Sequence, residues 1–103
     1  MATGTNEEAF DQVYRLIKKG DRVSVRAWIA AGGDANLCNR FGWSLLMSAA
    51  LRGRTDIVED LLAAGGDPNL RNDFGDTAIG LARLKGFDRT AEAIERAMVG
   101  DGV

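Results

Sequence analysis

The sequence has no histidine, one cysteine and one proline among its 103 residues. Because histidine is the commonest general base near neutral pH, its absence argues against an acid–base enzyme. The single cysteine, Cys38, can form no internal disulfide and has no imidazole to activate it as a nucleophile. The sequence also lacks a Cys/His cluster for zinc and a phosphate-binding loop of the G-x-x-x-x-G-K-[ST] type. We therefore predict a protein that is not an enzyme and has no catalytic residues, no metal site and no cofactor.

Neither sign of charge dominates, and long apolar runs are absent. The net charge is −2, from 13 basic and 15 acidic residues, which gives no overall attraction to nucleic acid or to an anionic membrane. No apolar run approaches the roughly 20 residues that span a bilayer. The first ten residues, MATGTNEEAF, lack the basic and apolar regions of a signal peptide. We expect a soluble, cytoplasmic protein that binds neither nucleic acid nor membrane.

What the sequence does contain is repetition. The segment AAGGDANLCNRFGWS (30–44) recurs as AAGGDPNLRNDFGDT (63–77), with ten of fifteen positions identical at an offset of 33 residues. The same offset relates Gly20, Gly53 and Gly86. A regular period of this length is typical of stacked repeat proteins. We predict one domain, residues 1–103, built from units at about 5–37, 38–70 and 71–100.

Each unit is predicted to hold two short helices. In the first, Phe10, Val13, Tyr14 and Ile17 have the spacing of one apolar helix face, and Thr5 with Glu8 fits a capping box. Ser44 and Thr77 are good N-caps for the first helices of the later units. The six helices are expected within residues 5–21, 22–31, 44–53, 55–65, 78–85 and 88–100. Because so small a helix pair cannot bury its apolar face alone, the pairs must stack.

The connectors between units carry glycine and asparagine at repeated positions. Gly32 and Gly65 are expected to end helices, and Gly42 and Gly75 to permit tight turns at positive φ. Asparagine side chains can bond to nearby backbone and so fix a loop. This local role is expected of Asn36, Asn39, Asn69 and Asn72.

Two motifs carry a family resemblance. NRFGWSLLMSA (39–49) and NDFGDTAIGLA (72–82) resemble D-x-x-G-x-T-P-L-H-x-A. GRTDIVEDLLAAGGDPN (53–69) and the earlier GDRVSVRAWIAAGGDAN (20–36) resemble G-x-x-x-I-V-x-x-L-L-x-x-G-A-D-x-N. The chain is therefore similar to ankyrin-repeat proteins, whose period is about 33 residues. The resemblance implies an all-α solenoid of three stacked helix–turn–helix units with short β-turn connectors.

The chain departs from the family pattern in two respects. The motif histidine is replaced by Met47 and Gly80, so the hydroxyl–imidazole bond that ties neighbouring family repeats is absent, and we expect looser coupling between units. The last helix is also more polar than its predecessor, which suits a terminal unit facing water. We therefore expect the first and last units to act as caps. The substitutions at the 33-residue offset are Ile57 to Thr90, Val58 to Ala91 and Leu62 to Glu95.

The resemblance implies binding to another protein through a concave surface of turn tips and first helices. Matching positions in the middle unit are Cys38, Arg40, Phe41, Trp43, Leu51 and Arg52; in the third unit they are Arg71, Asp73, Phe74, Asp76, Leu84 and Lys85; the first unit adds Phe10, Lys18 and Lys19. Cations and aromatics dominate this set. Carboxylates such as Asp60 and Glu92 fall on second helices, so we expect a basic inner face and an acidic back. The predicted partner presents an acidic and partly apolar surface.

Alternatives stay open for individual residues. Phe41 and Phe74 recur at one motif position, so they either pack the turn stems or contact a partner. Trp43 does not recur and favours an interface, whereas Trp28 is expected in the core. Arg40 fits either solvated surface or a contact. The same two interpretations apply to Arg52.

The leading functional interpretation is a protein-binding module. Alternatives are an immunity-type inhibitor of a co-encoded toxin or enzyme, and an accessory subunit of an assembly. Stacking of nucleic-acid bases on the aromatics is disfavoured by the balanced charge. Self-association through Trp43, Leu51 and Leu84 is also open, so the expected state is a monomer or a weak homodimer.

Overall fold

A computed structural model describes residues 6–99 and contains six helices in that range. They are α1 (Asn6–Lys19), α2 (Arg22–Ala30), α3 (Leu45–Leu51), α4 (Thr55–Ala63), α5 (Ala78–Leu84) and α6 (Asp88–Val99). These bounds confirm the predicted helices to within a residue or two. The expected contact between Thr5 and Glu8 involves a residue outside the described range. Between residues 6 and 99 the only β pairing is an isolated bridge from Cys38 to Ser44.

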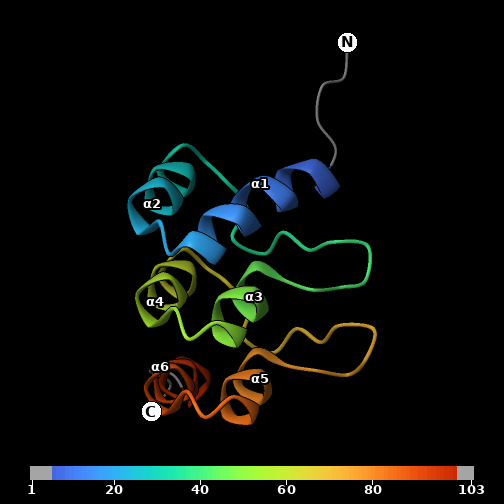
Figure 1. Cartoon of the computed structure of the whole chain (residues 1–103), viewed down its shortest axis with the longest axis vertical. Helices are drawn as coiled ribbons and strands as arrows, with labels where there is room; N and C mark the ends of the chain where they lie inside the picture. The colour runs from blue at the N-terminus through green and yellow to red at the C-terminus, as the bar shows by residue number, and fades with distance from the viewer. Residues whose placement is uncertain (1–5, 100–103) are drawn as a thin grey trace.

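The helices form two parallel layers (Figure 1). The first helix of each unit (α1, α3 and α5) stacks in one layer, and the second helix (α2, α4 and α6) stacks in the other. The two connectors, residues 31–44 and 64–77, extend to the same side of the stack (Figure 1). This arrangement confirms the expected all-α solenoid of repeated helix pairs.

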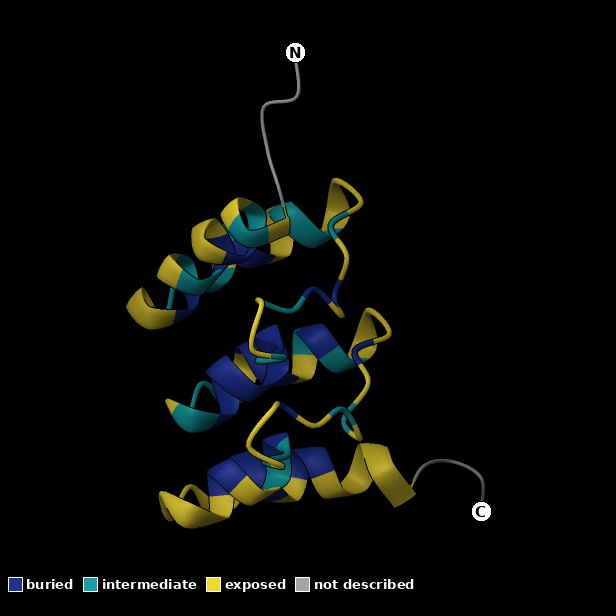
Figure 2. Cartoon of the chain, turned by 90° about the vertical axis from the view of Figure 1, so that its right-hand side faces the viewer, coloured by how far each residue is buried: buried dark blue, intermediate teal, exposed yellow. Residues whose placement is uncertain are grey.

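The core is densest in the middle unit. Leu45, Leu46, Met47, Ala49 and Ala50 of α3 are each at most 1% exposed, because α1 packs on one side of this helix and α5 on the other. Figure 2 shows the buried residues concentrated at this level, with exposed residues in the connectors and on the outer helices. Small alanine side chains allow neighbouring helices to approach closely, so α3 has almost no solvent-facing surface.

The predicted helix caps are present. Ser44 Oγ accepts a hydrogen bond from the Met47 N–H at 3.0 Å, and Thr77 Oγ1 accepts one from the Gly80 N–H at 3.2 Å. A third cap, not predicted from the sequence, is Asp21 of α2, whose carboxylate accepts from the Ser24 N–H at 3.1 Å. Each cap satisfies one backbone donor that the first helical turn leaves without a partner.

Only part of the asparagine prediction is correct. Asn39 Oδ1 accepts from the N–H groups two and four residues ahead, and Asn72 does the same in the next unit. Asn36 instead bridges the connectors, donating to the Gly65 carbonyl at 3.0 Å and accepting from the Asp67 N–H at 2.7 Å. The local bond expected of Asn36 is made by an aspartate two residues earlier, whose carboxylate accepts from the Asn36 N–H.

In the next unit an aspartate again forms the local hydrogen bond that was expected of an asparagine. The Asp67 carboxylate accepts from the Asn69 N–H at 2.8 Å, so the aspartate again makes the local bond that was expected of the asparagine side chain. In this motif the aspartate therefore forms the hydrogen bond within its own connector, and the Asn36 side chain forms hydrogen bonds to the next connector.

The last helix is less water-facing than expected. Thr90 is 1% exposed, and its hydroxyl lies 2.7 Å from the Thr55 hydroxyl of α4. Ala91 is also buried, so these two substitutions lie inside the junction with α4. Glu95 is exposed as predicted, and its carboxylate lies 3.6 Å from Arg83 of α5. Increased polarity in a last helix therefore does not by itself indicate a surface that faces water.

The core prediction for Trp28 holds in part. Trp28 packs at the edge of the core with its ring directly over Gly33, while Val25 of the same helix is fully buried. The glycine turns have the expected positive φ, including +78° at Gly42 and +83° at Gly75. No helix within residues 6–99 combines the length and the apolar character needed to span a membrane.

Candidate functional site

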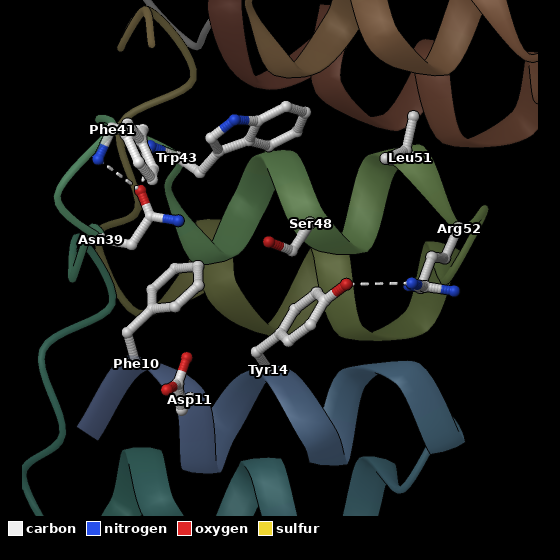
Figure 3. A pocket seen from close by; sticks show the side chains of 9 residues that line it. All are labelled: Phe10, Asp11, Tyr14, Asn39, Phe41, Trp43, Ser48, Leu51 and Arg52. Atoms are coloured by element: carbon white, nitrogen blue, oxygen red, sulfur yellow. Dashed lines mark hydrogen bonds between the residues drawn. The ribbon is translucent and has the colours of Figure 1, made fainter. Parts of the chain in front are cut away.

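A groove of about 330 Å³ lies between α1 and the middle unit (Figure 3). Its lining comes from three segments that are far apart in the sequence. Phe10, Asp11 and Tyr14 come from α1; Asn39, Phe41 and Trp43 from the first connector; and Ser48, Leu51 and Arg52 from α3 and the residue that follows it. The groove therefore exists only when the first two units stack.

Aromatic rings form two walls of the groove. Phe10 and Tyr14, four residues apart on α1, have ring centroids 6.0 Å apart and planes inclined by 14°. Trp43 and Leu51 lie opposite them (Figure 3). Phe10 is only 3% exposed, so the expectation that it belongs to the open surface is wrong; it packs in the core and also lines the groove.

The end of the groove away from the connector is basic. Arg52 Nη2 donates a hydrogen bond to the Tyr14 hydroxyl oxygen at 3.0 Å, and the Arg52 guanidinium carbon lies 5.6 Å from the Tyr14 ring centroid. Lys18 Nζ lies 5.2 Å from the same centroid. Two cations therefore lie against one aromatic ring, an arrangement that the negative face of the ring stabilises.

Five residues of the predicted partner-binding surface line this groove: Phe10, Phe41, Trp43, Leu51 and Arg52. Phe41 is 49% exposed and its counterpart Phe74 is 72% exposed, so neither is buried in a turn stem. Trp43 is partly buried against the core while still lining the groove. An open aromatic surface is therefore present where the sequence predicted one.

The third-unit residues are not part of the groove. Arg71 Nη1 donates to the Gly75 carbonyl at 3.2 Å, and Asp76 Oδ2 accepts from the Asn72 side-chain amide at 3.2 Å, so both stabilise their own turn. Asp73 is exposed, and its backbone N–H donates to the Phe41 carbonyl at 2.9 Å. Leu84 and Lys85 are exposed at the end of α5.

Arg40 is engaged within the chain. Its backbone N–H donates to the Glu7 carboxylate, and its guanidinium lies 3.9 Å from that carboxylate. The guanidinium carbon is also 5.6 Å from the Phe41 ring centroid. The positive charge of Arg40 is therefore partly compensated by Glu7 within the chain itself.

The back of the molecule carries cations as well as carboxylates. Arg22 of α2 donates to both carboxylate oxygens of Asp60 on α4, at 2.9 and 3.2 Å, and lies 3.9 Å from Asp56. The hydrogen bond to Asp60 raises the pKa of Arg22 above its ordinary value. These contacts compensate part of the charge that was expected to make the back acidic, and the division into a basic face and an acidic back stays a prediction.

Cys38 has the environment of an unreactive thiol. Burial, and secondarily the charge of Asp34, raise the pKa of the Cys38 thiol, which keeps it protonated near neutral pH. Its sulfur lies 3.4 Å from the Asn36 carbonyl oxygen. Among residues 6–99 no cluster of three histidine, cysteine, aspartate or glutamate side chains has the arrangement of a metal site.

Four groove residues were not among the predicted site residues: Asp11, Tyr14, Asn39 and Ser48. The spacing of α1 placed Tyr14 on the inward face, and the 33-residue offset aligns it with the buried Met47. Its contact with Arg52 joins residues 38 positions apart, and no periodic pattern in the sequence encodes it. The one sequence feature that could have indicated this part of the groove is the presence of two aromatic residues, Phe10 and Tyr14, on the first helix.

Comparisons with known proteins agree with this architecture. The family model described as ankyrin repeats, in three copies, matches residues 13–95. A stretch of 51 residues, 48% of this chain, is 41% identical to part of the 2-5A-dependent ribonuclease of Mus musculus. The matched stretch covers 7% of the ribonuclease, so the similarity concerns a small part of that protein.

Proposed function

The chain belongs to the ankyrin-repeat family, and from this premise we propose that it binds a partner protein through its turn tips and first helices, centred on the groove between α1 and α3. Ankyrin repeats are generally protein-interaction modules and are typically non-catalytic. The proposal adds the surface used by this chain and the chemical character of its partner.

One observation carries the proposal: large apolar and aromatic side chains line an open groove in a domain with a small core. Phe41, Trp43 and Leu51 surround a cavity of about 330 Å³, with Arg52 at its rim. Tryptophan and arginine around a desolvated pocket are the composition of binding hot spots. Exposing such side chains to water is unfavourable, and a partner that covers them gains the free energy of their burial.

The charge near the groove favours an acidic partner. Lys19, Arg52 and Lys85 stand at the same position in successive units and are all exposed. Cations at this position also suit the C-terminal ends of the first helices, so the aromatic groove carries more weight than the charges. Complementary charge on a partner would speed association and orient it.

An inhibitor of a co-encoded toxin and an accessory subunit would both use this surface. The experiment therefore concerns the surface itself. A photo-crosslinking phenylalanine derivative is placed at Phe41, at Phe74 or at Val23, and the chain is produced in its own cells. Val23 is the matched control, because it is 79% exposed but lies on α2.

We expect adducts with one partner protein at Phe41 and Phe74, and none at Val23. Adducts formed at Val23, with none at the two connector positions, would show that the partner binds the opposite layer and would refute the proposed surface.

A further inference from the structure

We propose that the groove between α1 and α3 is an anchor pocket for one amphipathic helix of a partner protein. A large apolar side chain of that helix fills the cavity, and a glutamate or aspartate one turn away binds the Tyr14 hydroxyl together with the Arg52 guanidinium. This inference rests on the proposed function, because it names the partner chemistry for the same surface.

The cavity has the size and lining for one large apolar side chain. Its volume of about 330 Å³ lies at the small end of the range typical of ligand pockets. The rings of Phe10 and Trp43 and the side chain of Leu51 are among the apolar groups that line it (Figure 3). Placing a leucine or phenylalanine side chain there removes apolar surface from water on both molecules.

The basic end of the groove offers two hydrogen-bond donors to one anion. The Tyr14 hydroxyl oxygen already accepts from Arg52 Nη2 at 3.0 Å, so the Tyr14 hydroxyl hydrogen is directed elsewhere. Within residues 6–99 the structure gives that hydrogen no acceptor. Arg52 is exposed, and its hydrogen bond to Tyr14 uses only one of its N–H groups. A carboxylate that accepts from both side chains would form charge-assisted bonds, and the nearby Lys18 ammonium would strengthen them.

The two ends of the groove differ in charge. This difference favours a ligand with a single acidic group and determines the end of the groove at which that group binds. Asp11 lies near the connector end and Arg52 at the opposite end (Figure 3). A single carboxylate beside Arg52 avoids repulsion from Asp11, whereas a chain of phosphates along the groove would meet it. The charge pattern therefore favours an acidic side chain of a protein over nucleic acid.

The next junction of the repeat lacks these features. At the 33-residue offset, Tyr14 becomes the buried Met47 and Trp43 becomes Asp76. Neither the phenol donor nor the indole wall recurs. Arg52 corresponds to the exposed Lys85, which supplies a matched control for the charge alone.

The test is an NMR titration of the isotopically labelled full chain with a defined peptide. The probe is an alanine-rich helical peptide of about 15 residues that carries leucine and glutamate four positions apart, on one helix face. The chain has two tryptophans, Trp28 of α2 and Trp43 of the first connector, so two indole N–H signals report separately on α2 and on the groove. We expect the Trp43 signal to shift on binding and the Trp28 signal to stay in place.

Peptide and protein variants isolate the carboxylate contact. A peptide with glutamine in place of glutamate should bind about fivefold more weakly. The variants Arg52→Gln and Tyr14→Phe should reduce this preference without weakening binding of the glutamine peptide, whereas Lys85→Gln should leave the preference unchanged. Trp43→Leu should weaken both peptides equally, and circular dichroism checks that each variant stays folded.

Three results would overturn the inference: no movement of the Trp43 signal at millimolar peptide, equal affinity for the two peptides, or an undiminished preference in Arg52→Gln. A phosphoserine peptide that binds more than about tenfold tighter than the glutamate peptide would assign the donors to phosphate instead. Crosslinks at Phe41 and Phe74 would survive any of these results, so failure of the anchor is distinguishable from failure of the proposed surface.

Discussion

The two junctions between units are held together by different chemistry. At the first, Arg22 pairs with Asp60, and Arg54 donates to the carbonyls of Ile17 and Lys18 at 3.1 and 2.6 Å. The second is more apolar and closer packed. There the Phe87 ring lies over Gly53, and buried Thr90 pairs with Thr55.

This difference accounts for the position of the groove. Long arginine and tyrosine side chains can reach across the first junction without bringing the two helices into full contact, which leaves space between α1 and α3. At the second junction the small side chains of Ala49, Ala50 and Ala82 are fully buried, because α3 and α5 approach closely. The cavity therefore forms at the junction where polar contacts supplement the apolar packing of α1 on α3.

The largest effect is expected from Gly53→Ala at the closely packed junction. Gly53 has φ +67°, and an added Cβ would lie 2.9 Å from the Phe87 ring. The left-handed backbone and the overpacking together should lower the free energy of unfolding by about 2–4 kcal/mol, measured by urea denaturation. Gly86→Ala is the matched control: its φ is +76° with no neighbour within 4 Å, so the loss should be only about 1–2 kcal/mol. Equal losses would show that the Phe87 ring moves aside freely.

The next effect is expected from Arg54→Ala at the polar junction. This change removes two charge-assisted hydrogen bonds to the carbonyls at the end of α1. Because the site is partly exposed, we expect a loss of about 1–2 kcal/mol in the free energy of unfolding. Arg26→Ala, at an exposed position of α2, should change it by less than about 0.5 kcal/mol. A loss no larger than that of Arg26→Ala would show that Arg54 contributes little to the junction.

A smaller effect is expected from the Arg22–Asp60 pair. A double-mutant cycle with Arg22→Ala and Asp60→Ala should give a favourable coupling energy smaller than the loss from Arg54→Ala, because the Arg22 side chain is 43% exposed. The coupling should fall further at high salt, where exposed charges are screened. A coupling energy that does not change with salt would contradict this electrostatic account.

The smallest effect concerns acid stability at the start of α2. The Ser24 hydroxyl and backbone N–H lower the pKa of Asp21 below its ordinary value of 3.8. A lowered folded-state pKa adds stability above the unfolded value and loses it as the pH falls through the folded value. The contribution of Asp21 should therefore begin to decline at about pH 4 and be lost as the pH falls through its lower folded-state pKa. In urea denaturation across this range, Asp21→Asn should lose less stability on acidification than the unmodified chain, and a parallel decline of the two would contradict the prediction.

The repeated features could be predicted from sequence because they are local. Ser44 and Thr77 cap helices, and Asn39 and Asn72 fix turns, through contacts that span a few residues. The 33-residue offset then copies each feature into the next unit. Fold, helix bounds and turn geometry follow from these short-range patterns.

The candidate site was less predictable because it forms between units. The sequence analysis placed Arg52 and Arg71 in the same partner-binding surface, yet Arg52 contacts Tyr14 across the junction and Arg71 bonds to its own turn. Thr90 likewise looked like a solvent-facing substitution, although it lies inside the second junction. Which neighbour a long side chain reaches depends on the separation of the stacked helices, and a single sequence does not state that separation.

The shape of each connector depends on hydrogen bonds to its backbone, so the side chains at its tip can be substituted. The Asn39 side chain accepts hydrogen bonds from the backbone N–H groups of residues 41 and 43. The Asn72 side chain accepts them from the backbone N–H groups of residues 74 and 76. Mutation at these tips can therefore alter recognition while the loop keeps its shape. A combinatorial library at 41, 43 and 74, with both asparagines retained, would turn this small scaffold into a source of new binders.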